Sequence, residues 1–74
     1  MKRELVQSSN IESIGYDGKT SKLEVKFHSG DVYQYANVPE FIYKGLHDAE
    51  SKGKYFHANI RDKYAFNKIE DKEK

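Results

Sequence analysis

The segment Lys22–Tyr43, which reads KLEVKFHSGDVYQYANVPEFIY, contains the pattern that decides the fold. Apolar residues alternate with polar residues before the pair Ser29-Gly30 and again after it, which is typical of two strands joined by a hairpin. A Val-Pro pair follows, and proline is favoured in the first turn of a helix. The segment therefore predicts a strand, a turn, a second strand and the start of a helix.

The length of the hairpin loop decides which face of the sheet carries Tyr33 and Tyr35. A loop of two residues, Ser29-Gly30, would place both rings on the charged face of the preceding strand, whereas a loop at 28–30 would place them on its apolar face. We favour the longer loop, because a type I turn with a bulge requires a left-handed residue at its end, where Gly30 lies. It also buries both rings in a small core, so the sequence predicts that they pack inward.

The remaining elements follow from shorter patterns. The sequence IGYDG at 14–18 alternates and ends in a turn pair, which predicts a strand ahead of the hairpin. Residues 37–51 have an apolar stripe at helical spacing, with Gly45 on the same side, which indicates close contact with a neighbouring backbone. Residues 52–64 predict a second, shorter helix. The predicted fold is α+β, of order β-β-β-α-α, with a three-stranded antiparallel sheet covered on one face by two helices.

Length and composition predict a single small domain. The chain has 74 residues and no cysteine, which excludes disulfides and thiolate zinc sites. We expect the domain to span residues 8–66, with flexible termini at 1–7 and 67–74. The sequence has no signal-peptide pattern and no apolar run near the roughly 20 residues of a membrane-spanning helix. These features predict a cytoplasmic protein with no membrane partner.

Residue types used in catalysis and metal binding lack the spacing that such sites require. His28, His47 and His57 have no second histidine or cysteine at ligand spacing. No serine lies in a nucleophile elbow, and the glycines form neither a phosphate-binding loop nor a dinucleotide fingerprint. The sequence therefore predicts a protein that is not an enzyme and uses no metal and no cofactor.

Charge is unevenly distributed along the chain. Residues 1–50 contain six Lys/Arg and eight Asp/Glu, whereas residues 51–74 contain seven and four. Between 52 and 68, cations interleave with aromatic side chains, and this combination can hold phosphates and stack unpaired bases. The simpler interpretation is a solvated surface. The candidate nucleic-acid-binding residues are Lys52, Lys54, Tyr55, His57, Arg61 and Lys63.

The order of the motifs IGYD, LEVKF, SG, VYQY, VPEFIY, AESKGKYF and IRDKY resembles the KTSC domain, over about residues 8–66. This family is named for the C-terminus of some lysyl-tRNA synthetases and also occurs as a stand-alone bacterial or phage protein. Its signature falls on Tyr33, Tyr35, Val38, Pro39, Ser51, Gly53, Tyr55, Phe56, Ile60, Arg61 and Tyr64. His57 departs from the pattern, which has an asparagine there. The attachment to a tRNA synthetase implies an RNA-binding role.

Two functional hypotheses follow. The first is a small non-catalytic module that binds single-stranded or structured RNA through residues 52–68. The alternative is a protein-protein interaction or regulatory module without a nucleic-acid ligand, which would use an open sheet edge or a groove beside a helix. Val32 lies on the face opposite the tyrosines, and we expect it to be a partly exposed apolar residue there.

Overall fold

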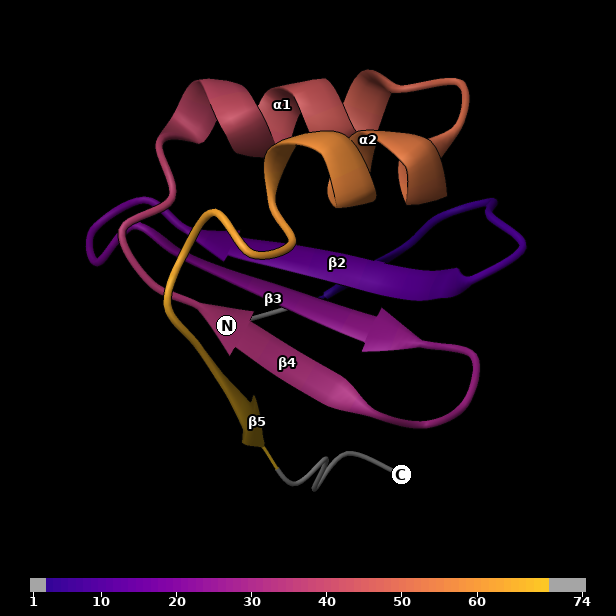
Figure 1. Ribbon diagram of the computed structural model, residues 1–74, viewed down its shortest axis with the longest axis horizontal. Helices are drawn as coiled ribbons and strands as arrows, with labels where there is room; N and C mark the ends of the chain where they lie inside the picture. The colour runs from indigo at the N-terminus through magenta and orange to yellow at the C-terminus, as the bar shows by residue number, and fades with distance from the viewer. Residues whose placement is uncertain (1–2, 70–74) are drawn as a thin grey trace.

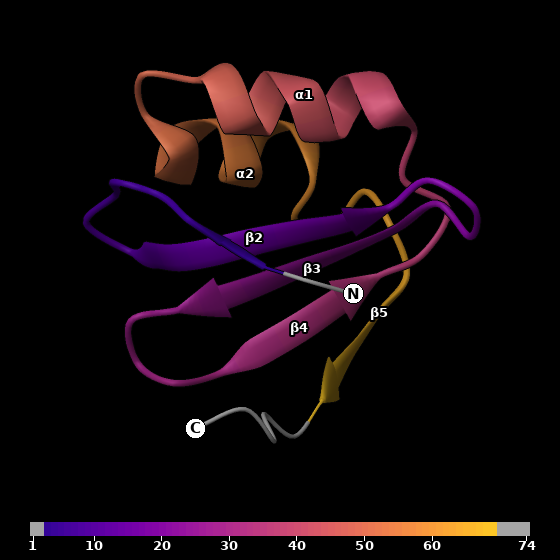
Figure 2. The same ribbon diagram turned by 180° about the vertical axis from the view of Figure 1, so that it is seen from behind.

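The computed structural model describes residues 3–69 and shows two layers. A five-stranded antiparallel sheet carries two helices over one face, as Figure 1 shows from the front and Figure 2 from behind. The elements in chain order are β1 (Glu4–Leu5), β2 (Ile11–Asp17), β3 (Lys22–Phe27), β4 (Val32–Tyr35), α1 (Glu40–Asp48), α2 (Lys52–Asn59) and β5 (Phe66–Ile69). The predicted α+β class, with two helices on an antiparallel sheet, is confirmed.

The predicted sheet of three strands, and with it the order β-β-β-α-α, is wrong. β1 pairs with β2 at one edge of the sheet, and β5 returns after the helices to pair with β4 at the other edge. Neither strand has an alternating pattern, because β1 has only two residues and β5 reads FNKI, with two adjacent polar residues between the apolar ones. Both strands form by pairing with the unpaired backbone groups at the outer edges of β2 and β4.

β1 and most of β5 lie in the segments 1–7 and 67–74, which we expected to be flexible termini of a domain at 8–66. In the described residues these segments contain ladder pairs, among them Glu4 with Ile14 and Tyr33 with Lys68. Residues 1–2 and 70–74 lie outside the described residues. Flexibility of the terminal segments in solution stays a prediction.

The register of the β3–β4 hairpin is the one predicted from the three-residue loop. Leu23 pairs with Tyr35 and Val25 with Tyr33, so both tyrosine rings lie on the apolar face of β3. The Phe27 amide donates to the Asp31 carbonyl at 2.9 Å, which closes the loop. Gly30 has a φ of 99°, a left-handed value that glycine adopts without steric cost. The position of this glycine therefore sets the face that each side chain of β4 occupies.

The core lies between this face of the sheet and the helices. Its buried members are Ile11, Ile14, Leu23, Val25, Tyr35, Val38, Leu46, Phe56 and Ile60. α1 begins at Glu40, directly after Pro39, and turns Leu46 toward the sheet. α2 ends at Asn59, well before the predicted end at Tyr64, although Ile60 is still fully buried. The chain then turns away through Asp62, whose φ is 64°.

The helices approach each other closely at Gly45. We predicted a neighbouring backbone at this position, but the neighbour is the side chain of Tyr55 from α2. A Cβ on Gly45 would clash with the hydroxyl and ring of Tyr55. The glycine therefore makes room for an aromatic ring between the helices, and Tyr55 packs against the core.

The opposite face of the sheet is more covered than the sequence indicated. Val32, expected to be partly exposed, is 1% exposed, and that expectation is wrong. Ile69 of β5 pairs beside Val32, so the strand that we did not predict closes this edge. On the same face, Glu24 is buried, forms an ion pair with Arg3, and accepts a hydrogen bond from Gln34 Nε2 at 3.5 Å. Its charge is thus compensated, as burial of a carboxylate requires.

Candidate nucleic-acid-binding site

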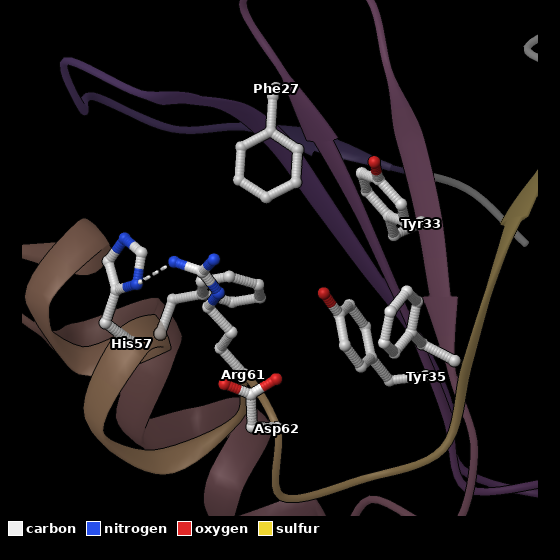
Figure 3. Close-up of a pocket in the computed structure, with 8 residues that line it drawn as sticks. Phe27, Tyr33, Tyr35, His57, Arg61 and Asp62 are labelled. Carbon is white, nitrogen blue, oxygen red and sulfur yellow. Dashed lines mark hydrogen bonds between the residues drawn. The ribbon is translucent and has the colours of Figure 1, made fainter.

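A pocket of about 340 Å³ opens where the C-terminal end of α2 faces β3, β4 and β5, and we call it the aromatic cleft. Figure 3 shows it with its side chains as sticks. The lining residues are Phe27, Tyr33, Tyr35, Phe56, His57, Arg61, Asp62 and Phe66. The volume lies within the range of roughly 300–1,000 Å³ that is typical of small-molecule sites.

The rings of the aromatic cleft form a continuous edge-to-face network. Ring centroids are 5.8 Å apart for Phe27 and Tyr33, 5.5 Å for Phe27 and Phe56, and 5.7 Å for Tyr33 and Phe66. Tyr35 lies 5.6 Å from Phe56. Such pairs each contribute about 0.5–1.5 kcal/mol beyond burial of their area. The network fixes the shape of the cleft without a ligand.

The floor and the rim of the aromatic cleft differ in exposure. Tyr35 and Phe56 are each 4% exposed and form the floor, whereas Phe66 is 50% exposed and forms part of the rim. Burial, with a smaller contribution from Tyr33, raises the pKa of Tyr35 to about 12. The Tyr35 hydroxyl therefore stays neutral near pH 7 and keeps its proton as a hydrogen-bond donor.

Polar groups on the helix side of the aromatic cleft carry the charge of the site. Arg61 Nη1 lies 3.2 Å from His57 Nδ1, and a guanidinium can only donate, so Nδ1 is the acceptor of this hydrogen bond. Figure 3 shows Arg61 between His57 and the two tyrosines, with Asp62 beside it. All three polar residues are exposed. The cleft can therefore present a cation and a carboxylate to a ligand whose flat part contacts the rings.

Of the six predicted site residues, only His57 and Arg61 line the aromatic cleft. Tyr55 packs toward α1 at Gly45 and does not line the cleft. Lys52 Nζ donates to the Ala49 carbonyl at 3.0 Å, which holds this side chain at the start of α2. Lys54 and Lys63 are exposed, but neither lines the aromatic cleft. The role of these residues in binding nucleic acid stays a prediction.

Six residues that line the aromatic cleft were not among the predicted nucleic-acid-binding residues, namely Phe27, Tyr33, Tyr35, Phe56, Asp62 and Phe66. We assigned Tyr33 and Tyr35 to the core, and Tyr35 is indeed buried. The alternation of β4 already predicted that Tyr33 and Tyr35 share one face of the sheet. The missing information was that α2 ends at Asn59 and leaves this end of the sheet uncovered by a helix.

The part of the chain that the structure describes contains neither a metal-binding cluster nor a membrane-spanning helix. Residues 3–69 contain no cluster of three or more histidine, cysteine, aspartate or glutamate side chains placed to hold a metal ion. Neither α1 nor α2, the helices of this range, is long and apolar enough to cross a membrane. The expectations that the protein is not an enzyme and uses no cofactor stay predictions.

Comparison with known protein families gives one clear match. The model of the KTSC domain matches residues 7–64, which is most of the chain. An uncharacterized protein from Stutzerimonas stutzeri strain A1501 is 45% identical over 56 residues, which cover 76% of this chain and 79% of the relative. The lysine–tRNA ligase of Nostoc punctiforme is 36% identical over 63 residues, which cover 85% of this chain but 11% of the ligase.

A solved structure agrees with these matches. The crystal structure of a KTSC domain protein from Yersinia pestis superposes with a TM-score of 0.90 at 41% sequence identity, covering 92% of this chain and 96% of that chain. The resemblance that the motifs indicated is therefore confirmed by sequence and by fold. The match to the ligase concerns only a small part of that enzyme.

Proposed function

The chain belongs to the KTSC domain family, and from this premise we propose that it is a non-catalytic module that binds single-stranded RNA in the aromatic cleft. The observation that carries the proposal is the pocket itself, in which aromatic rings lie opposite an arginine and a histidine. RNA-binding modules recognise unpaired bases by stacking them on such rings and by holding the backbone with cations.

The geometry of the rings favours a flat ligand. Phe66 is half exposed at the rim, and the rings of Tyr33 and Tyr35 lie 5.7 Å and 5.4 Å from it. A base that stacks on an aromatic ring gains about 1–3 kcal/mol. An unpaired base is thus a ligand of suitable shape for a cleft with this lining.

The charge near the aromatic cleft favours an anionic ligand, though modestly. Arg61 and Lys63 are cationic and exposed, and Asp62 between them offsets part of their charge. Few phosphates can be neutralised by so few cations, so the dependence of binding on salt is expected to be shallow. Relatives named as lysine–tRNA ligases carry a region similar to this chain, which is consistent with a role near RNA.

Titration of an isotope-labelled sample with a short single-stranded RNA tests the proposal. We expect shifts of the backbone amides of residues that line the aromatic cleft, and we expect these shifts to shrink as salt is raised. Phe66→Ala is expected to reduce the binding free energy by about 1–3 kcal/mol. Phe41→Ala is the matched control, because Phe41 is 71% exposed on α1 and does not line the cleft. The proposal is overturned if millimolar RNA shifts none of these amides.

A second candidate function is recognition of a protein partner at the sheet edge. In the described residues, β5 pairs with β4 on one side and with no strand on the other. A peptide could add a strand there through backbone hydrogen bonds. This mode would protect the amides of Phe66–Ile69 from hydrogen exchange without salt-sensitive shifts at Arg61, which distinguishes it from RNA binding.

A further inference from the structure

The aromatic cleft continues into two further hollows. A hollow of about 470 Å³ shares Phe27, Tyr33 and His57 with the cleft. A second, of about 370 Å³, shares Ser9, Asn10 and His57 with the first. His57 lines all three spaces, and we call the two added hollows the polar arm. In Figures 1 and 2 the β1–β2 loop, the β3–β4 turn and the α1–α2 connection, which supply most of the polar arm, lie at the same end of the molecule.

The chemistry of the surface changes along this path. The aromatic cleft is lined mainly by rings, whereas the polar arm presents hydroxyl, amide and ammonium groups from Ser9, Asn10 and Lys54. A nucleotide combines the same two kinds of surface, because its base is flat and aromatic whereas its ribose and phosphate are polar. Two carboxylates, Glu50 and Asp31, also line the polar arm and oppose an anion there.

The wall of the polar arm is held in place without a ligand. Ser8 Oγ accepts hydrogen bonds from the amides of Asn10 at 3.3 Å and Ile11 at 3.2 Å. The His28 amide donates to the Asn10 carbonyl at 3.0 Å, which ties the β1–β2 loop to the hairpin turn. A Cβ on Gly53 would lie 3.3 Å from Asn10 Nδ2, so the glycine lets this loop pack against α2. A wall formed in advance reduces the ordering cost of binding.

We infer that the polar arm holds the ribose and phosphate of the nucleotide next to the one in the aromatic cleft. The shortest well-bound ligand is then a dinucleotide, with one base in the cleft and its backbone leading past His57 toward Lys54. This inference rests on the proposed function, and it adds the direction and the minimal length of the bound strand.

A series of ligands of increasing length tests the inference. The probes are adenosine monophosphate, the adenylate dinucleotide and the adenylate tetranucleotide, titrated against the full chain at low salt. We expect the dinucleotide to bind about three- to tenfold more tightly than the mononucleotide, since it adds one charged contact with its hydrogen bonds. The tetranucleotide is expected to add little beyond the dinucleotide.

Two substitutions with opposite expected effects on affinity test where the phosphate of the ligand lies. Lys54→Ala is expected to weaken dinucleotide binding about two- to fivefold, as for an exposed charge pair. Glu50→Gln is expected to strengthen it by a similar factor, because it removes a charge that repels phosphate. Both are expected to leave mononucleotide binding unchanged. Lys44→Ala is the matched control, because Lys44 is exposed on α1, pairs with Glu40 at 3.7 Å, and lines neither the aromatic cleft nor the polar arm.

The outcomes separate the two proposals. Equal affinity for the mononucleotide and the dinucleotide would overturn the inference and leave RNA binding in the aromatic cleft intact. A loss of mononucleotide binding in Lys54→Ala would also overturn it, because the mononucleotide's own phosphate would then reach the polar arm without a second nucleotide. Failure of all three ligands to bind would overturn the proposed function and the inference together.

Discussion

The two helices cover the sheet in different ways, and the tyrosines beneath them differ accordingly. The ring of Tyr16 from β2 stacks against that of Tyr43 from α1, with centroids 5.0 Å apart and an interplanar angle of 9°. The Tyr16 hydroxyl donates to the Val38 carbonyl at 2.6 Å, so its polar group is satisfied within the fold. Beyond the end of α2, the rings of Tyr33 and Tyr35 line an open cleft.

This difference shows that alternation along a strand predicts which face of the sheet carries a side chain, but not whether that side chain is covered or lines a cleft. Tyr16 and Tyr33 both project from the sheet toward the helix layer, and both are partly buried. What separates them is the extent of the helix above each one. We therefore expect changes under α1 to affect stability, and changes in the aromatic cleft to affect binding.

The largest expected effect is that of Phe56→Ala. Phe56 is 4% exposed and contacts the rings of Phe27 and Tyr35 from α2. Removing a buried phenylalanine costs about 3–5 kcal/mol, and a domain of this size rarely has more than about 3–5 kcal/mol to lose. The variant is expected to be largely unfolded by circular dichroism. Phe66→Ala is the control at the rim, and a cooperative urea transition for Phe56→Ala near that of the wild type would contradict the prediction.

The second prediction concerns alkaline pH. Burial raises the pKa of Tyr35 to about 12 in the folded chain, above its ordinary value of 10.0. The folded state then holds this proton more tightly than the unfolded state, so the stabilisation is present below pH 10 and is lost as pH rises toward 12. Urea midpoints measured through this window should fall for the wild type.

Substitutions at two tyrosines separate the contributions to this alkaline loss. The urea midpoint of Tyr35→Phe should fall less steeply with pH than that of the wild type through the same window. The pKa of Tyr43 is raised as well, first by burial and then by Glu4, so Tyr43→Phe should remove a separate part of the loss. Identical pH profiles for the wild type and Tyr35→Phe would show that Tyr35 does not cause the decline.

The third prediction compares the region under α1 with the aromatic cleft by removing one tyrosine hydroxyl from each. Tyr16→Phe deletes the hydrogen bond to the Val38 carbonyl, and we expect it to cost about 0.5–1.5 kcal/mol in the free energy of unfolding. Tyr33→Phe is expected to leave stability nearly unchanged, because its ring contacts remain. The comparison loses its basis if the two substitutions destabilise the chain equally.

The smallest expected effect is at the junction of α1 with β1. His47 lies 3.1 Å from Asp48 and 2.7 Å from Glu4, and these hydrogen bonds raise its pKa above 6.5, with Asp48 contributing most. The Tyr43 ring lies 6.1 Å away on the same helix. The stabilisation is full below pH 6.5 and is lost as pH rises through the raised pKa of His47. Protection of the β1 amides from hydrogen exchange, measured relative to the intrinsic exchange rate at each pH, should therefore fall across that range in the wild type and not in His47→Gln.

The parts of the fold that the sequence predicts are those in which a local rule leaves a single solution. Gly30 requires the longer loop, and that loop fixes the register of β3 and β4 and the inward direction of Tyr33 and Tyr35. Val38 and Pro39 place the start of α1 within a residue. Each of these features is decided by residues that are close together in the sequence.

The parts that the sequence did not predict depend on contacts between distant segments. β5 becomes a strand because β4 offers an unpaired edge, although FNKI alone does not alternate between apolar and polar residues. The buried state of Val32 follows from that pairing. The aromatic cleft likewise depends on the position at which α2 ends, which helix propensity places only within a few residues.

The arrangement of the sheet also has a consequence for how this domain can be tethered to another protein. β1 lies at one edge and β5 at the other, with three strands between them. A linker that joins ahead of β1 would leave the side of the sheet that carries Phe66 unobstructed. A linker that continues from β5 would extend from the edge strand that carries Phe66 at the rim of the aromatic cleft, where it could shield the cleft. Fusions made at the front of the chain are therefore the ones expected to preserve access for a ligand.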